Sequence, residues 1–410
     1  MKTRRNPPRR RSDAMSPEDF DQALDAILCD RRDKHQLRQR IEVHPIDSTH
    51  VRIGGQIFTN FASNNYLGLT HHPRLRAAAE SALHSGIGSG AAGLISGYTD
   101  LHREAEQTIA RWKQTEACVL LPSGYQANVA AIQTLSVLGE GDSLGKPHVR
   151  FLLDKLVHAS LIDAVKLSGA DYRIFPHNHL VKLQRLLGDA PKIQVVVTES
   201  IFSMDGDAAD LRGLARIKRQ HPFVLLLDEA HGSGVYGKDG AGYAAEIGLS
   251  DVVDVSIVTL SKALGSGGGA VCGPRKFCDA LLNTGRAYIY STSVPPLIAA
   301  AAREAVKICA DEPQRQQRVR ELSRRVRTEL GGAGMQIPPG DSPIIPLILG
   351  DEARAMRAAE LLREKGMLAV AVRPPTVARG SSRLRITLSC DHTDREIDEL
   401  IRELARLGTG

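Results

Sequence analysis

The sequence predicts an α/β fold with a mostly parallel central sheet covered by helices, followed by a smaller α+β C-terminal domain. Between about residues 117 and 273, short apolar runs without polar alternation recur, with helix-forming stretches between them. This pattern is typical of buried parallel strands joined by βαβ crossovers. Polar residues follow several of these runs, and ligands of such sheets bind at the carboxyl ends of the strands. The sequence therefore predicts one site along one edge of the sheet.

Length and composition describe an ordinary globular chain. The 410 residues suffice for one large α/β domain with appendages, and 42% hydrophobic and 24% charged residues are typical of such proteins. No uncharged apolar run reaches the roughly 18 residues of a membrane-spanning helix, which excludes an integral membrane protein. The six cysteines form no CxxC pair and have no histidine at zinc-ligand spacing. We therefore expect reduced thiols, a cytoplasmic location and no metal site.

Residues 1–15 are predicted to be a disordered basic tail. Residues 1–11 contain six basic residues and no acidic one, which accounts for the whole net charge of +6. The rest of the chain is formally neutral, so nucleic-acid binding could come only from the tail. No aromatic residue interleaves with the arginines there, which argues against it. A transit peptide is a further alternative, disfavoured because Ser12 is the only early serine.

Residues 16–60 are predicted to form an N-terminal helix and a hairpin. The Ser-Pro-Glu-Asp start and the apolar spacing that follows predict a helix over 16–42. Residues 51–61 carry Gly-Gly between two β-rich runs, which predicts the hairpin.

The large domain is predicted over 61–296, with its strands in five apolar runs. These runs are 117–124, 151–160, 194–202, 223–232 and 256–262. Each leads into polar residues: Ser123 and Gly124, His158, Glu199 and Ser203, Asp228 and His231, and Lys262.

The C-terminal α+β domain is predicted over 297–410. Its elements are a helix at 297–330, a strand at 343–349, a helix at 352–366, strands near 368–373 and 383–389, and a helix at 394–407.

Lys262 and Asp228 are the most informative of these polar residues. A lysine at a strand end before a glycine-rich stretch can form a Schiff base with a carbonyl cofactor, because low polarity lowers its pKa. The alternative for Lys262 is a surface lysine beside a flexible turn. A buried aspartate needs a cationic partner, which the protonated nitrogen of a pyridine ring would supply to Asp228. The alternative for Asp228 is a helix N-cap.

The combined pattern decides between these alternatives. Ser123, Gly124 and Tyr125 follow a strand and open a helical stretch, where backbone amides suit a phosphate. His158 could stack on a planar ring, although a lone histidine is more often structural. A lysine, an aspartate, a stacking ring and a phosphate cradle together describe a site for pyridoxal 5′-phosphate (PLP).

At these residues the sequence resembles the α-oxoamine synthases, fold-type-I PLP-dependent transferases that condense an amino acid with an acyl thioester and release CO2. The resemblance extends from about residue 20 to 407. It is carried by FASNNYLGLTHHP (61–73), GSGAAGLISGYTDLH (88–102), SGYQANVA (123–130), HASLIDA (158–164), VTESIFSMDGD (197–207), DEAHGSGVYG (228–237), TLSKALG (259–265), YSTSVPP (290–296) and RPPTVARGSSRLRITLS (373–389).

The resemblance implies roles for the matched residues. Lys262 would bind the cofactor covalently and move protons at the substrate Cα, with Asp228 at the ring nitrogen and His158 stacked on the ring. Ser203 and His231 would lie near the cofactor's phenolic oxygen, and Glu199 would also bind the cofactor. Ser123, Gly124, Tyr125 and Thr259 would hold the phosphate, and Ser291 or Thr292 would reach it from the second subunit of a homodimer. Asn64 and Arg385 would clamp the amino-acid carboxylate, whereas Arg38, in the N-terminal helix, and Thr376 would contact the acyl substrate.

The RPPTV start of the last motif favours the branch of the family that joins L-alanine to a pimeloyl thioester of coenzyme A or acyl carrier protein. Sister branches that use glycine or serine with another acyl thioester are the nearest alternative. A non-catalytic partner subunit is the alternative of another class, disfavoured because Lys262, Asp228 and His158 are all present.

Three features depart from the family pattern. Gly93 stands where arginine is common, Val157 precedes His158 where serine is usual, and residues 139–150 are predicted to form an unusually long surface loop. The first of these bears on the acyl donor.

Overall fold

The computed structural model describes residues 17–34, 36–138, 149–188 and 193–408. The chain divides into two compact units, Met1–Val43 and His44–Gly410. This division falls inside the segment predicted at 16–60, and the predicted domain boundaries remain a prediction. The predicted disorder of residues 1–15 lies outside the described residues. So does the loop predicted at 139–150, apart from its last two residues, which begin a strand.

The first unit contains one helix, α1 (Pro17–Asp33), within its described residues. The prediction of a helix over 16–42 is wrong beyond Asp33, and Arg38 is exposed outside the helix. The apolar stripe of this segment ends at Leu28. Between residues 34 and 42 the only apolar residues are Leu37 and Ile41, too few for an apolar face that packing could stabilise as a helix.

In the described residues of the second unit, the largest sheet has seven strands in the order β4-β10-β9-β8-β7-β5-β6. Its strands are β4 (Ala117–Leu121), β5 (Val149–Asp154), β6 (Asp171–Phe175), β7 (Ile193–Glu199), β8 (Val224–Asp228), β9 (Val255–Thr259) and β10 (Gly269–Gly273). The five strands from β9 to β6 in this order are parallel, whereas β10 is antiparallel to both of its neighbours. The predicted mostly parallel sheet is confirmed.

Strand β10 was not expected from the sequence. Its segment begins and ends with glycine, and glycine in a strand usually weakens the strand signal. At Gly269 the glycine is required, because a Cβ there would lie 2.7 Å from the Cα of Gly124. The absence of a side chain at Gly269 lets the helix that starts at Gly124 approach the sheet edge.

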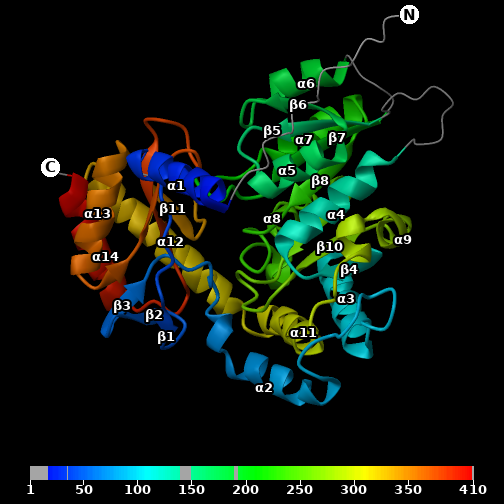
Figure 1. Ribbon diagram of the computed structural model, residues 1–410, viewed down its shortest axis with the longest axis horizontal. Helices are drawn as coiled ribbons and strands as arrows, with labels where there is room; N and C mark the ends of the chain where they lie inside the picture. Colours follow the sequence, from blue (N-terminus) through cyan, green and yellow to red (C-terminus); the bar gives the residue numbers. More distant parts are fainter. Residues whose placement is uncertain (1–16, 35, 139–148, 189–192, 409–410) are drawn as a thin grey trace, which may run out of the picture. The chain divides into compact units, whose positions relative to one another are not determined.

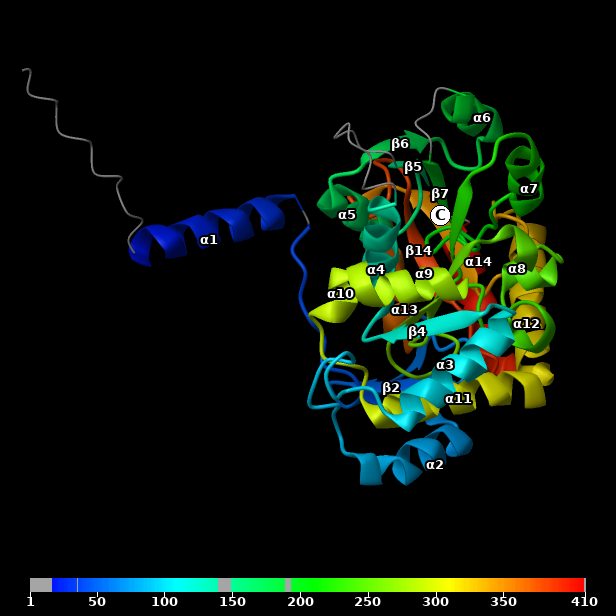
Figure 2. The same ribbon diagram turned by 90° about the vertical axis from the view of Figure 1, so that its right-hand side faces the viewer.

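Helices surround this sheet, some packed on its two faces and others packed on those helices. They are α2 (Pro73–Ser81), α3 (Asp100–Lys113), α4 (Gly124–Ser136), α5 (Ala159–Ser168), α6 (Leu180–Gly188), α7 (Leu211–Gln220), α8 (Tyr243–Glu246), α9 (Arg275–Thr284), α10 (Arg286–Ile289) and α11 (Pro296–Asp311). Short 3-10 turns occur at Leu69–His71, Leu83–Ser85, Lys238–Gly240 and Ser250–Val252. Helix α11 lies alongside α2 and α3 (Figure 1, Figure 2).

The core has two parts, one on each face of the sheet. In β4, Cys118 and Leu120 pack into one cluster, and Val119 and Leu121 pack into the other. All five residues of β4 are buried. Burial on both faces explains why these strands are apolar throughout instead of alternating.

The C-terminal elements lie together at one end of the second unit (Figure 1). They are α12 (Pro313–Gly332), β11 (Ile344–Gly350), α13 (Glu352–Glu364), β12 (Met367–Leu368), β13 (Val370–Val372), β14 (Ser382–Thr387) and α14 (Asp394–Gly408). The predicted single helix at 297–330 is wrong: α11 ends at Asp311, and Pro313 starts α12, because proline lacks the N–H that would continue a helix.

The predicted hairpin is confirmed. Strands β2 (His50–Ile53) and β3 (Gln56–Asn60) are antiparallel around Gly54 and Gly55, which both have positive φ. Strand β1 (His44–Pro45) extends this sheet on one side, and β12 pairs with β3 on the other. The hairpin is thereby tied to the C-terminal elements.

Among the described helices, none combines the length and the apolar character needed to cross a lipid bilayer. All six cysteines are free thiols. The cytoplasmic location stays a prediction from the sequence.

Candidate active site

The carboxyl ends of β7, β8 and β9 bring the predicted polar residues to one edge of the sheet. Glu199 ends β7, Asp228 ends β8 directly opposite it, and Thr259 ends β9. Lys262 follows in the next turn. Parallel strands end at the same edge, so residues far apart in the sequence meet there.

A first chain of hydrogen bonds starts at Asp228. This carboxylate is buried, and its Oδ1 accepts a hydrogen bond from the Ala230 amide at 2.9 Å. Its Oδ2 accepts from Asn128 Nδ2 at 2.9 Å, and the same Nδ2 donates to Ser160 Oγ at 2.9 Å. Ser160 Oγ lies 2.7 Å from His158 Nδ1. No α-helix starts at Asp228, so the aspartate is not a helix N-cap.

The first chain fixes the imidazole of His158. Its Nδ1 accepts from the Ser160 amide and lies at hydrogen-bond distance from the Ser160 hydroxyl. Burial lowers the pKa of His158, against the attraction of Asp228. The ring is therefore neutral at pH 7 and carries its proton on Nε2. His158 is the N-cap of α5, and its imidazole ring is held in one orientation.

Burial favours the neutral form of Glu199. It is buried, and its Oε1 has no hydrogen-bond partner among the described residues. Burial raises the pKa of Glu199 well above its usual value, and the nearby charge of Asp228 raises it further. Two carboxyl groups, those of Glu199 and Asp228, therefore lie at this edge of the sheet. Glu199 ionises readily only when a cation lies close to it.

A second chain of hydrogen bonds starts at Lys262. Its Nζ lies 2.9 Å from His231 Nε2, and His231 Nδ1 lies 2.7 Å from the Tyr66 hydroxyl. The Tyr66 hydroxyl donates to Asn64 Oδ1 at 3.1 Å, and Arg385 Nη2 donates to the same oxygen at 3.1 Å. The chain joins the predicted catalytic lysine to the predicted carboxylate clamp.

The hydrogen bond from Tyr66 to Asn64 indicates one arrangement of protons in the second chain. Because Tyr66 gives its only proton to Asn64, His231 Nδ1 must donate to the Tyr66 oxygen. His231 Nε2 then has no proton and accepts from Lys262. This agrees with the pKa of His231, which burial and the positive charge of Lys262 hold well below its usual value. His231 is a neutral acceptor that directs the amine of Lys262.

The amine of Lys262 is also set by its surroundings. Burial lowers its pKa, whereas the charges of Asp228 and Glu199 act in the opposite direction. A lysine in this environment is more readily deprotonated than one in water. The surface-lysine alternative does not fit these contacts.

The predicted phosphate cradle lies at the start of α4. Ser123 is the N-cap of this helix, and its Oγ accepts from the Gln126 amide at 3.1 Å. A Cβ at Gly124 would lie 2.5 Å from Thr259 Oγ1, so only glycine fits here. The hydroxyl of Thr259 and the first amides of α4 are thus adjacent. Tyr125, in the first turn, is 47% exposed.

Three other predicted cofactor ligands lie in loops of the same unit. Ser291 Oγ accepts from Gln126 Nε2 at 3.0 Å, which places it beside the first turn of α4 in the same chain. Thr292 pairs with Ala92 in an isolated bridge. The carbonyl oxygen of Ser203 accepts from Arg385 Nε at 2.7 Å. That Ser291 or Thr292 serves the site of a second subunit stays a prediction.

Two predicted substrate residues are not brought to this edge. Thr376 is exposed and its amide donates to the Arg373 carbonyl within its own turn. Arg38 belongs to the first unit and is not placed with respect to the site. Their roles toward the acyl substrate remain predictions.

Gly93 has a structural reason of its own. A Cβ at this position would lie 2.4 Å from the hydroxyl of Tyr288 and 3.1 Å from Ser293 Oγ. Tyr288 and Gly93 line the same cavity of about 260 Å³, which contains none of the residues of the two hydrogen-bond chains. Arginine could not replace Gly93 unless Tyr288 moved.

Besides Ser160, sequence reasoning missed two members of these chains, Tyr66 and Asn128. Tyr66 lies in the quoted FASNNYLG segment, 165 residues before His231, and is fully buried. Asn128 lies in the quoted SGYQANVA segment, and its amide joins Asp228 to Ser160. A buried hydroxyl or amide is expected to have a partner. That rule could have marked both residues but could not have named their partners.

Replacement of Tyr66 by phenylalanine should lower kcat about tenfold, equivalent to the loss of about 1.4 kcal/mol from one buried hydrogen bond. Without the hydroxyl, His231 Nδ1 loses its acceptor and the second tautomer of His231 becomes accessible. Steady-state kinetics of the purified variant would measure the effect. The Tyr236→Phe variant is a control, because the Tyr236 hydroxyl bonds Asp341 away from the site. Equal rates for wild type and Tyr66→Phe would contradict the tautomer argument.

The residues at this edge fit PLP. The phosphate would meet the open amides of α4, where a Cβ at Gly124 or Gly269 would close the space. Within the described residues the buried carboxylate of Asp228 forms no ion pair, and it suits a protonated ring nitrogen. Lys262 has the lowered pKa that covalent attachment to a carbonyl requires.

Comparison with known proteins agrees with a PLP-dependent enzyme. Residues 56–404 match the family model described as aminotransferase class I and II. The 8-amino-7-oxononanoate synthase of Cellvibrio japonicus is 39% identical over 395 residues, which cover 95% of this chain and 97% of that protein.

Solved structures agree in fold. Serine palmitoyltransferase from S. paucimobilis, a lysine variant solved with a bound PLP–myriocin aldimine, has a TM-score of 0.86 at 26% identity, covering 96% of this chain and 98% of that one. The 8-amino-7-oxononanoate synthase of Francisella tularensis has a TM-score of 0.73 at 27% identity, covering 86% and 98%. The predicted fold-type-I architecture is confirmed.

Proposed function

Because this chain belongs to the α-oxoamine synthases of the class I and II aminotransferase family, and within them to the 8-amino-7-oxononanoate synthases, we propose that it condenses L-alanine with a pimeloyl thioester. The products are 8-amino-7-oxononanoate, CO2 and the free thiol, and the reaction belongs to biotin synthesis. The observation that carries the proposal is the second hydrogen-bond chain. It joins a proton-carrying amine, Lys262, to a carboxylate clamp at Arg385.

Groups at the carboxyl ends of the strands and at the start of α4 would hold the cofactor. Thr259 and the first amides of α4 suit its phosphate, Asp228 its ring nitrogen and His158 the face of its ring. When bound, PLP supplies an electron sink for negative charge that develops at the amino-acid Cα. The neutral imidazole of His158 adds no competing positive charge above the ring.

Arg385 and Asn64 would orient the amino acid. Arg385 uses one N–H toward the Ser203 carbonyl and one toward Asn64, and a guanidinium has five such donors. The remaining donors suit a carboxylate, which is the group that leaves as CO2. Fixing this group aligns the Cα–H bond toward Lys262.

Lys262 would move the Cα proton. Its lowered pKa makes the neutral amine more available as a base than that of a lysine in water, and His231 holds the amine in position through its unprotonated Nε2. The same amine can return the proton after CO2 has left. One base, Lys262, therefore suffices for both proton transfers, and the neutral His231 holds it in position.

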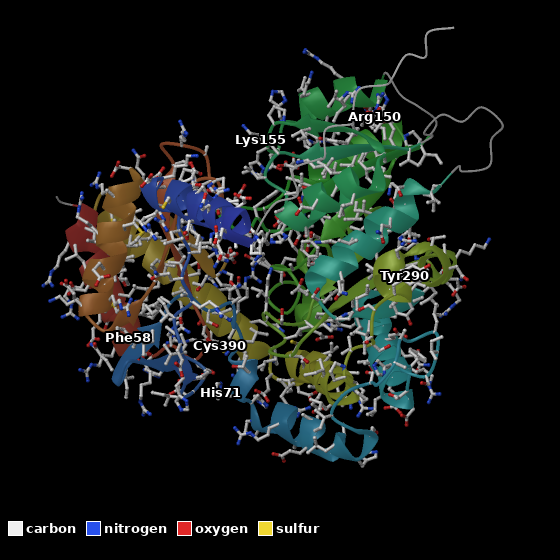
Figure 3. All side chains as sticks on the ribbon, in the orientation of Figure 1. Phe58, His71, Arg150, Lys155, Tyr290 and Cys390 are labelled. Carbon is white, nitrogen blue, oxygen red and sulfur yellow. The ribbon has the colours of Figure 1, made fainter. Side chains whose placement is uncertain are left out.

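We place this site in a homodimer. The segments around Ala92 and Thr292 pair with each other and display large apolar side chains. Ile87 is 72% exposed, Ile95 is 81% exposed, and Tyr290, which follows α10 and is labelled in Figure 3, is 73% exposed. Large apolar side chains exposed on paired segments favour burial against a partner. The same segments carry Ser291 and Thr292, the residues proposed to reach the second subunit's phosphate.

Thiol release tests the proposed reaction. We expect release from pimeloyl-coenzyme A or pimeloyl-acyl carrier protein with L-alanine, and not from acetyl-coenzyme A with glycine or palmitoyl-coenzyme A with L-serine. Release in a glycine or serine pairing would move the chain to a sister branch. No release in any pairing by a cofactor-loaded dimer would favour the non-catalytic partner subunit.

A further inference from the structure

His177 and Asn178 hold the loop that carries Ser203, although neither residue belongs to the two hydrogen-bond chains of the site. His177 Nδ1 lies 3.0 Å from Asp154 Oδ1, at the end of β5, and its Nε2 lies 2.7 Å from Asp207 Oδ2. The imidazole thereby bridges two carboxylates that come from different parts of the fold. Its ring also packs edge-on against the buried Phe202, with centroids 4.4 Å apart.

Asn178 completes the attachment through its backbone and its amide. The Asn178 N–H donates to Asp154 Oδ2 at 2.9 Å, and its side-chain Nδ2 donates to the Ala208 carbonyl at 3.0 Å. The amide of Asp210 donates to Asn178 Oδ1 at 3.1 Å. We name the loop 200–209 the Ser203 loop, and the pair His177 and Asn178 its clamp.

The other side of the Ser203 loop contacts β14. The Ser203 carbonyl accepts from Arg385 Nε at 2.7 Å, and Asp205 forms an ion pair with Arg383. The loop therefore lies between the clamp and the arginine that would bind the amino-acid carboxylate. A shift of the loop would shift the Ser203 carbonyl and, with it, the plane of the Arg385 guanidinium.

We propose that His177 is a positioning residue that sets the orientation of Arg385 through the Ser203 loop, and so determines the affinity for the substrate carboxylate. This inference rests on the proposed function for the identity of the amino acid. It concerns binding of the amino acid and not the movement of its Cα proton, which Lys262 performs.

The charge of His177 supports this role. Burial alone would lower its pKa, but the hydrogen bonds and charges of Asp154 and Asp207 raise it to about 10. The imidazole is therefore protonated at neutral pH and donates to both carboxylates. Asp207 has no other ion pair in the described chain, and its Oδ1 is buried without a partner. The contact with His177 is thus the side-chain attachment of Asp207, beside the backbone hydrogen bond from the Phe202 amide to the Asp207 carbonyl.

The test compares three single variants and the His177→Gln/Asp207→Asn double variant of the cofactor-loaded protein. His177→Gln keeps a polar side chain but cannot bridge both carboxylates, and Asp207→Asn removes the other half of the contact. His179→Gln is the matched control, because His179 is exposed and bonds only the Lys182 amide of its own helix start. Calorimetric titration with L-alanine, without acyl thioester, measures binding apart from turnover. Steady-state kinetics separate kcat from KM.

We expect at least a fivefold increase in the Kd and KM for L-alanine in His177→Gln and in Asp207→Asn. The kcat at saturating L-alanine should stay within twofold, and His179→Gln should match the wild type. The double variant should bind no more weakly than either single one, because both changes remove the same contact.

Unchanged L-alanine affinity in both folded single variants would overturn the proposal, and so would a fall in kcat at unchanged Kd. Failure of both single variants to fold would also overturn it, since His177 would then serve the fold alone. If the wild type binds glycine or L-serine instead of L-alanine, the proposed substrate is wrong. The same comparison with that amino acid still decides the role of His177, because the carboxylate is shared.

Discussion

Lys262→Ala should lower kcat by on the order of 10⁴-fold, the upper range for loss of a positioned acid–base group. The variant loses the only amine placed 2.9 Å from the unprotonated Nε2 of His231. Water could enter the space but would lack both the lowered pKa and the covalent bond to a carbonyl cofactor. Thiol release with L-alanine and the pimeloyl thioester measures the loss.

The fold should survive this change. Lys262 is only half-buried in a turn after β9, and Glu199, whose pKa is already raised, can remain protonated without the lysine beside it. The neighbouring Ser261→Ala is the control, because Ser261 is exposed and should leave turnover unchanged. Circular dichroism and size-exclusion chromatography would verify the folded state. Turnover within tenfold of the wild type would refute the role of Lys262.

Asp228→Asn should lower kcat by about 10² to 10³-fold, the range for loss of one preorganised electrostatic contact. The substitution keeps the shape of the side chain but removes the negative charge opposite the proposed ring nitrogen. Steady-state kinetics at saturating cofactor measure this loss. Retention of cofactor separates weak binding from slow chemistry.

The first hydrogen-bond chain predicts how the protein accommodates this asparagine. The new amide N–H₂ would face Asn128 Nδ2, so Asn128 must turn its Oδ1, which is buried without a partner, toward residue 228. That rotation removes the donor from Ser160 and alters the contact that holds His158. Asn128→Ala is the informative comparison: it should disturb His158 while leaving the charge of Asp228, and should cost less than Asp228→Asn. Equal losses in the two variants would argue against a direct role of that charge.

The sequence predicted the strands that are buried on both faces, because their apolar runs are visible in the local sequence. The apolar runs that end at Asp228 and Thr259 were recognisable because burial on both faces removes alternation. Strand β10 was not recognisable, since it begins with Gly269, which serves a close contact with Gly124 rather than strand propensity. The order of the strands also depends on contacts between distant segments, which no local pattern records.

The site was predictable at the residues whose chemistry is unusual for their position. A lysine and an aspartate at the ends of apolar strands stand out, so Lys262 and Asp228 could be named from the sequence. Tyr66 and Asn128 could not, because a tyrosine in a core and an amide in a helix are common. Their importance comes from the partner that folding places beside them, such as His231 beside Tyr66. Arg38 shows another limit of local reasoning, because the helix that was predicted to contain it ends at Asp33.

The position of β10 has a consequence for how the chain acquires its cofactor. Strand β4 is at the edge of the sheet and pairs only with β10, in a register that joins Leu121 to Gly269. Until β10 docks between β4 and β9, the helix start at Gly124 and the hydroxyl of Thr259 belong to separate parts of the chain. Pairing across so long a loop is slow, because closure entropy precedes any contact energy. A partly folded chain therefore has no phosphate cradle, and the cofactor binds only molecules whose sheet is complete. Excess cofactor in the refolding buffer should thus raise the yield of native protein by mass action rather than template its early steps.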